Sequence, residues 1–179
     1  MAQWQADNQT SGKISILTAY GLGKAQRLIH GLAPLCGPIF THTAVENTNA
    51  ILRDCGVAVP PTILLTPQIK PDDLKQGIII MPPAAAESAA VRKLGPCEVG
   101  FASGWMGVRG IRRRRGVDRG FVMSDHADWP ALNEAIAATG AQNVYVTHGY
   151  TEIFAKWLND TGHNASVVPT VFGGDEDSE

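Results

Sequence analysis

The chain has few cysteines, and they are not arranged as metal ligands. Only Cys36, Cys55 and Cys97 occur among 179 residues, and no two of them form a CxxC pair. An odd number of widely spaced cysteines fits a reducing compartment and excludes the common zinc-finger spacing. We therefore assign none of the three a catalytic role.

Long apolar runs are also lacking. No stretch approaches the roughly 20 residues that span a membrane, and the first residues do not show the charged-then-apolar pattern of a secretory signal. We therefore expect a soluble, cytoplasmic protein without a membrane partner. Hydrophobic residues make up 44% of the chain, which is typical of a globular protein, and its length allows one folded core or at most two.

No excess of one charge marks the chain as a whole, because its net charge is only −2. The charges are unevenly distributed, however, and the last residues from Asp175 onward form an acidic tail that we expect to be disordered. The clustered cations are Arg109, Arg112, Arg113, Arg114, Arg115 and Arg119. Such a run is usually a solvated loop, but four consecutive guanidinium groups also attract phosphates strongly, so we consider Arg109 and Arg112 to Arg115 candidate nucleic-acid contacts.

A complete nucleotide-binding loop is missing as well. Residues 21–24, Gly-Leu-Gly-Lys, match neither GxxxxGK[ST] nor GxGxxG, so nucleotide binding is the least favoured function. We interpret this segment as a turn that starts a helix. Lys24 at that helix start is a further candidate for a nucleic-acid phosphate, because free amides and the helix dipole favour anions there.

Short apolar segments alternate with amphipathic ones along most of the chain. Residues 1–12 are polar, and we expect them to be frayed. The predicted strands lie at 14–18, 38–40, 78–81 and 98–102, and the predicted helices at about 25–32 and 45–53. This alternation predicts an α/β fold with a mostly parallel sheet.

One unit occurs twice near the end of the chain. Apolar residues 121–123 and 144–146 predict strands that lead to His126 and His148, and predicted helices follow at 130–138 and 152–160. Ligands bind beyond the carboxyl ends of parallel strands. We therefore expect both histidines at the edge of one shared sheet, where they would converge on a metal or phosphate site.

The neighbours of the two histidines suggest different chemistry. Asp125 and Asp128 can orient the His126 imidazole or raise its pKa, which suits a proton donor to a leaving oxygen. Asp128 is equally suited to cap the helix that begins before Pro130. His148 is followed by Gly149, whose flexible backbone suits a metal ligand, although a structural histidine under the next helix fits the same pattern.

Several of these segments resemble a known family. Residues 124–128 (Ser-Asp-His-Ala-Asp) and 146–149 (Val-Thr-His-Gly) resemble motifs B and C of the β-CASP branch of the metallo-β-lactamase fold, which contains nucleic-acid-cutting enzymes. Residues 19–28 resemble the helix entry of the β-CASP domain. Residues 104–106, the arginine-rich loop and residues 119–130 are most similar to the ligase-associated DNA exonucleases, relatives of messenger-RNA 3′-end processing factors.

The resemblance implies a division of the chain. Residues 1–12 would be a polar N-terminal segment, 13–101 a β-CASP α/β region, 102–172 the C-terminal portion of a metallo-β-lactamase αββα sandwich, and 173–179 the acidic tail. The HxHxDH metal motif of the family is not found in the sequence, so a separate N-terminal half is the implied partner.

The resemblance also implies roles. His126, as the motif B histidine, would help to protonate the leaving group, with Asp125 and Asp128 beside it, and His148, as the motif C histidine, would bind one of two zinc ions. The substrate would be DNA, in a repair system with a DNA ligase or helicase, and RNA is the alternative. Because one metal-binding histidine cannot hold two zinc ions, we expect little activity from the chain alone. The other reading is a non-catalytic remnant that binds nucleic acid or protein.

Overall fold

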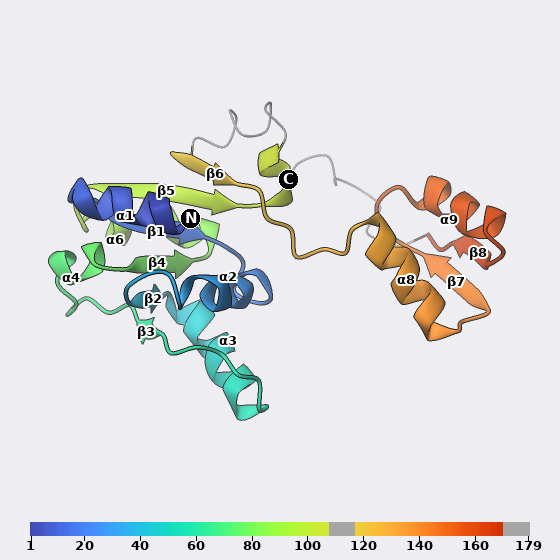
Figure 1. The fold of residues 1–179 in the computed structure, drawn as a ribbon, viewed down its shortest axis with the longest axis horizontal. Coiled ribbons are helices and arrows are strands. Elements are labelled where there is room, and N and C mark those ends of the chain that lie inside the picture. Colours follow the sequence, from blue (N-terminus) through green and yellow to red (C-terminus); the bar gives the residue numbers. More distant parts are fainter. Residues whose placement is uncertain (108–116, 170–179) are drawn as a thin grey trace. The chain divides into compact units, whose positions relative to one another are not determined.

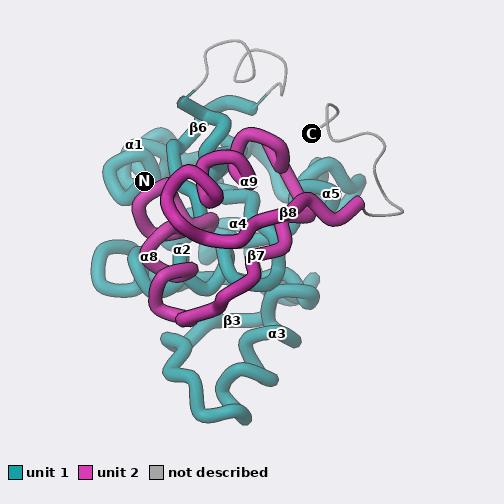
Figure 2. Tube along the Cα trace, turned by 90° about the vertical axis from the view of Figure 1, so that its right-hand side faces the viewer, with its two compact units in different colours: residues 1–125 teal, residues 126–179 magenta. Residues whose placement is uncertain are grey.

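The structure is a computed structural model that describes residues 1–107 and 117–169 (Figure 1). Arg109 and Arg112 to Arg115 lie outside the described residues, as does the acidic tail. The chain divides into two compact units, residues 1–125 and residues 126–179, coloured separately in Figure 2. We describe each unit by itself.

Unit 1 is built on a six-stranded sheet in which every neighbouring pair of strands is parallel. Its order is β3-β2-β4-β1-β5-β6. The strands are β1 (Ile14–Thr18), β2 (Ile39–Thr41), β3 (Ile63–Leu64), β4 (Ile78–Met81), β5 (Cys97–Ala102) and β6 (Arg119–Phe121). The predicted parallel α/β architecture is therefore confirmed, and the predicted strands at 14–18 and 78–81 have the predicted bounds.

Helices cover both faces of this sheet. They are α1 (Ala2–Thr10), α2 (Lys24–Leu32), α3 (Thr43–Asp54), α4 (Pro71–Lys75), α5 (Pro83–Ala86) and α6 (Ala89–Arg92), with a 3-10 turn η1 (Gly104–Gly107). Side chains alternate between the faces along β4. Ile78 and Ile80 pack with residues of α1, α2 and α3, whereas Ile79 and Met81 pack with residues of α4, α5 and α6. Burial on both faces explains why β4 is a continuous apolar run.

The expectation that residues 1–12 are frayed was wrong. They form α1, which buries Trp4 and Asn8 against the sheet. The Trp4 indole donates a hydrogen bond to the Glu98 carboxylate at 2.9 Å, and its ring meets Phe121 edge-on with centroids 5.4 Å apart. Asn8 donates to the Ser15 hydroxyl at 3.0 Å. Hydrogen-bonded polar side chains anchor this helix, so a search for apolar periodicity does not find it.

Unit 2 is a small βαβ arrangement with one further helix. Its elements are α8 (Trp129–Thr139), β7 (Asn143–Val146), α9 (Thr151–Asp160) and β8 (Asn164–Val167). β7 and β8 pair in parallel as a two-stranded sheet. The helices predicted at 130–138 and 152–160 are confirmed to within one residue. The buried apolar residues are Val146, Ala155, Leu158 and Ala165.

The expected boundary after residue 101 falls inside β5, and the chain divides into its two compact units after Asp125. The assignment of these parts to a β-CASP region and a metallo-β-lactamase portion stays a prediction. Within the described ranges, no helix is both long enough and apolar enough to cross a membrane.

Candidate functional site

The segment that leads to His126 leaves the sheet earlier than expected. β6 ends at Phe121, so Val122 and Met123, which were predicted to belong to the strand, lie beyond its end. The loops that follow β5 and β6 are held together by two backbone hydrogen bonds, from the Ser103 amide to the Phe121 carbonyl at 3.0 Å and from the Met123 amide to the Ser103 carbonyl at 3.3 Å. Residues 122–125 are therefore placed at the carboxyl edge of the parallel sheet.

Helix α2 binds this segment at two points. The Lys24 ammonium lies 3.0 Å from Asp125 Oδ1, with side-chain exposures of 9% and 29%. One turn later, Arg27 Nη1 donates a hydrogen bond to the Ser124 carbonyl at 2.5 Å. The Lys24 ammonium also lies 5.6 Å from the centre of the Tyr20 ring. A phosphate contact by Lys24 stays a prediction, but in this structure its charge is directed at Asp125.

Gly23 forms the turn that leads into α2 beside this ion pair. It precedes α2 with φ +82°, a backbone conformation that side-chain-bearing residues rarely adopt. A Cβ at this position would lie 3.5 Å from Asp125 Oδ2. That distance is an ordinary van der Waals contact, so the positive φ of the turn into α2, and not the approach of Asp125, is what favours glycine at this position.

Asp128 lies on the other side of His126, at the start of unit 2. Its Oδ1 accepts a hydrogen bond from the Ala131 amide at 2.9 Å and caps α8, while Pro130 occupies the first turn. The capping interpretation of Asp128 is thus confirmed. A role for Asp128 in orienting His126 stays a prediction. His126 itself is exposed between Asp125 and Asp128.

His148 follows β7 by two residues, as predicted, and is exposed in the loop that leads to α9. Gly149 has φ +75°, so the sharp turn expected after His148 is present. The expected shared sheet was wrong, because β6 belongs to the six-stranded sheet and β7 to the two-stranded sheet. The convergence of His126 and His148 on one centre stays a prediction.

The described part of the chain does not contain a complete metal site. No group of three or more histidine, cysteine, aspartate or glutamate side chains lies close enough there to hold a metal ion. A zinc ion takes three or four protein ligands. His148 would therefore need ligands from another segment, and its role as a zinc ligand stays a prediction.

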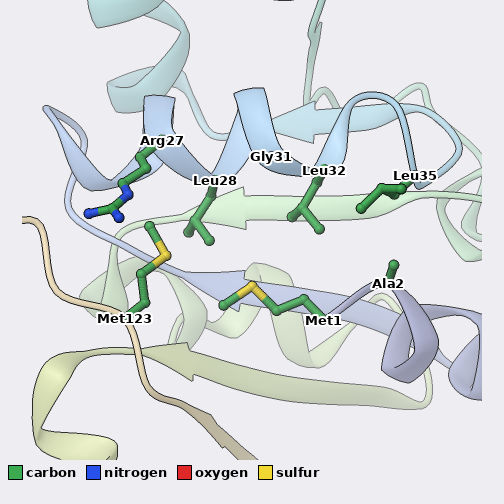
Figure 3. Close-up of a pocket in the computed structure, with 8 residues that line it drawn as sticks. All are labelled: Met1, Ala2, Arg27, Leu28, Gly31, Leu32, Leu35 and Met123. Carbon is green, nitrogen blue, oxygen red and sulfur yellow. The ribbon is translucent and has the colours of Figure 1, made fainter.

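An apolar pocket of about 360 Å³ lies in unit 1 beside the segment of residues 122–125 (Figure 3). Met1 and Ala2 at the start of α1, residues of α2 and Met123 form its walls. The lining residues are Met1, Ala2, Arg27, Leu28, Gly31, Leu32, Leu35 and Met123. Arg27 is the only lining residue with a charged side chain, and the other lining side chains are apolar.

Sequence reasoning missed Arg27. Lys24 and Arg27 are three residues apart, so they lie on one face of α2, and this spacing was visible in the sequence. Their partners Ser124 and Asp125 are remote in sequence, however. Only the topology, which brings the end of β1 near the end of β6, shows what the two cations bind.

No protein-family model matches the chain. A protein named probable DNA ligase from Opitutus terrae is 29% identical to the chain over 155 residues. The matched region covers 87% of this chain and 15% of that protein, so the chain spans about 15% of the length of this curated relative.

Proposed function

We propose that the chain is part of a zinc-dependent phosphodiesterase of the DNA exonuclease type that acts in DNA repair. The observation that carries a role on DNA is the similarity to the protein named as a probable DNA ligase, which covers most of this chain. The matched region is a small part of that long protein. A nuclease segment that lies in the same polypeptide as a ligase would give such a match over a small part of a long protein.

The nuclease assignment rests on motifs B and C. The structure has both histidines in loops after strands, with a helix following each loop. In the proposed reaction His126 donates a proton to the leaving oxygen of the scissile phosphodiester. His148 contributes one ligand to zinc, which would activate water and neutralise charge on the phosphate. Arg109 and Arg112 to Arg115 would contact the nucleic-acid backbone.

The remaining zinc ligands would come from an N-terminal metallo-β-lactamase half. The surface of unit 2 supports such a partner. Helix α8 has no buried residue, and Tyr150 and Ile153 are 85% and 68% exposed. Parallel sheets are normally covered on both faces, and an apolar surface of this kind marks an interaction site. We propose that the N-terminal half covers it.

The decisive experiment joins this chain to an N-terminal segment that carries HxHxDH and measures degradation of DNA with and without zinc. We expect zinc-dependent degradation that His148→Ala abolishes and that His126→Ala slows about 10²- to 10⁴-fold. His163→Ala is the matched control, because His163 lies between α9 and β8 and has no assigned role. Undiminished cleavage by the His148 variant would reject the assignment. Parallel assays on RNA of the same sequence test the alternative substrate.

A second candidate is a non-catalytic remnant that binds nucleic acid or protein. It is favoured by the lack of a complete metal-binding cluster among the described residues. It predicts that this chain supplies no zinc ligand, so that His148→Ala leaves the zinc content of the joined protein unchanged, and that DNA binding weakens steeply with salt. Replacing Arg112 to Arg115 together by glutamine would then remove most of the binding. Metal analysis of the purified joined protein separates the two functions.

A further inference from the structure

Both acidic neighbours of His126 have partners of their own, and these partners belong to different units. Asp125 pairs with Lys24 in unit 1, whereas Asp128 caps α8 in unit 2. The hydrogen bond from Arg27 to the Ser124 carbonyl adds a second fixed point just before Asp125. Between the two anchored carboxylates the chain contains only His126 and Ala127.

The ion pair between Lys24 and Asp125 restrains the segment that contains residues 124 and 125. The Lys24 side chain is only 9% exposed, and a buried ammonium without a partner is strongly disfavoured. Loss of the Asp125 carboxylate from this position would leave such a charge. Surface ion pairs lack this constraint, because water replaces either partner at little cost. Although Ser124 and Asp125 are exposed, the pairing with a buried ammonium therefore restrains them more than an ion pair between two exposed side chains would.

We propose that Lys24 and Arg27 are positioning residues for His126. They hold residues 124 and 125, which directly precede His126, against α2 in unit 1, and Asp128 caps α8 in the unit that begins with His126. In this arrangement Asp125 acts as the counter-ion of Lys24, and Lys24 acts on the backbone segment before His126 instead of on a phosphate. The role of His126 as a proton donor rests on the proposed function. The anchoring of residues 124 and 125 by Lys24 and Arg27 does not depend on that function.

The anchoring matters for proton transfer because a general acid must lie within hydrogen-bond reach of the leaving oxygen. A displacement of about 1 Å reduces a rate by about 100-fold. Loss of the anchor should therefore lower kcat and leave KM nearly unchanged. A phosphate contact by Lys24 predicts a different result, namely weaker DNA binding with a shallower dependence on salt.

The first test measures backbone order in the whole chain by nitrogen-15 relaxation. We expect order parameters near 0.85 for residues 123–125 in the natural chain and below about 0.6 in Lys24→Met, with recovery in Lys24→Arg. Arg27→Met, at an exposed position where the fold is not at risk, should show a smaller loss of order in the same residues. Unchanged order parameters in Lys24→Met and in Arg27→Met would overturn the proposal.

Lys13→Met is the matched control. Lys13 also forms a long-range ion pair in unit 1, with its ammonium 2.8 Å from Glu98 Oε1, but it precedes β1 whereas Lys24 follows it. This variant should leave the order of residues 123–125 unchanged. An equal loss of order in Lys13→Met would overturn the proposal, since the effect would then reflect general loosening of unit 1.

The second test measures DNA degradation by the joined protein. We expect Lys24→Met to lower kcat at least 10-fold with KM within twofold, and Lys24→Arg to recover most of the rate. A raised KM with unchanged kcat would overturn the positioning role. If the joined protein without substitutions degrades no DNA, the proposed nuclease function is rejected. The order parameters alone then test whether Lys24 and Arg27 anchor residues 124 and 125.

Discussion

Both units contain a parallel sheet, but the sheet of unit 1 is buried more completely than the sheet of unit 2. In unit 1, helices cover both faces of the six-stranded parallel sheet around its central strands, and β4 is fully buried along its length. In unit 2, as far as residue 169, two parallel strands have a core of four buried apolar residues, and large apolar side chains remain exposed. The comparison teaches that the helices of unit 1 bury the centre of its sheet, whereas unit 2 leaves apolar surface exposed, which the proposed N-terminal half would cover.

Matched isoleucine truncations should give the largest contrast between the units. Ile79 is 0% exposed in β4, and Ile153 is 68% exposed in α9. We expect Ile79→Ala to lower the free energy of unfolding by about 3 kcal/mol or more, because it removes buried methyl groups and leaves a cavity. Ile153→Ala should change the value by less than about 0.5 kcal/mol in the chain alone. Urea denaturation followed by circular dichroism measures both changes.

The same pair sharpens the partner proposal. When the N-terminal half is joined, Ile153→Ala should become destabilising by about 1 to 2 kcal/mol if that half covers α9. The Ile79→Ala effect should not change. An effect of Ile153→Ala that is equally small with and without the N-terminal half would contradict coverage of this surface.

The next largest effect concerns a carboxylate inside unit 1. Burial alone would raise the pKa of Glu46, but hydrogen bonds outweigh it and hold the pKa at about 2. The donors are Thr41, Thr62, Arg53 and Asn49. Because the carboxyl of the unfolded chain titrates near 4.5, the unfolded state binds more protons between these values. The stability from this network is thus complete above about pH 5 and is lost as the pH falls toward 2.

We expect Glu46→Gln to lower stability at pH 7 by about 2 kcal/mol and to flatten the stability profile between pH 5 and pH 2. Urea denaturation at several pH values measures this profile. Asp160→Asn in unit 2 is the control, because Asp160 is exposed, and it should leave the profile as in the natural chain. A profile that is equally steep in Glu46→Gln would show that other groups cause the acid sensitivity.

The sequence predicts elements well where local pattern and burial agree. Residues 78–81 are apolar and bounded by a proline, so the strand is evident, and α8 was placed correctly because Asp128 and Pro130 mark its start. Helix α1 was missed because polar hydrogen bonds hold it. Val122 was assigned to a strand because it is apolar, yet it is 70% exposed and lies beyond the residues that pair with β5.

The candidate site divides in the same way. The position of His148 after β7 and the cap at Asp128 follow from local pattern, and both were predicted. The pairing of Lys24 with Asp125 and of Arg27 with Ser124 joins distant parts of the chain. Such contacts depend on strand order, which the sequence pattern does not specify, because many orders satisfy the same alternation of strands and helices.

A smaller effect is expected from the aromatic contact that joins α8 to α9. The Trp129 ring meets Phe154 and Trp157 edge-on, with centroids 5.2 and 5.4 Å away. We expect Trp129→Ala to lower the local stability of unit 2 by about 1 to 2 kcal/mol, because each such pair contributes about 0.5 to 1.5 kcal/mol. Hydrogen exchange of the α9 amides measures this loss. Tyr150→Ala, which removes an 85% exposed ring, should have a much smaller effect, and the reverse order would contradict the assigned packing.

The smallest effect should come from an ion pair on the surface of unit 2. Lys156 and Asp160 approach to 2.5 Å on α9, but their side chains are 76% and 59% exposed. In unit 1 the Arg53–Glu46 pair is more buried, and its arginine also donates to the Val59 and Pro60 carbonyls. We expect Lys156→Ala to change the free energy of unfolding by less than about 0.5 kcal/mol, because water and salt screen an exposed pair. Arg53→Ala should cost about 2 kcal/mol or more, because it leaves the Glu46 charge partly buried without its cation. Urea denaturation at low and high salt compares the two, and a larger loss from Lys156→Ala would show that α9 depends on charge more than on packing.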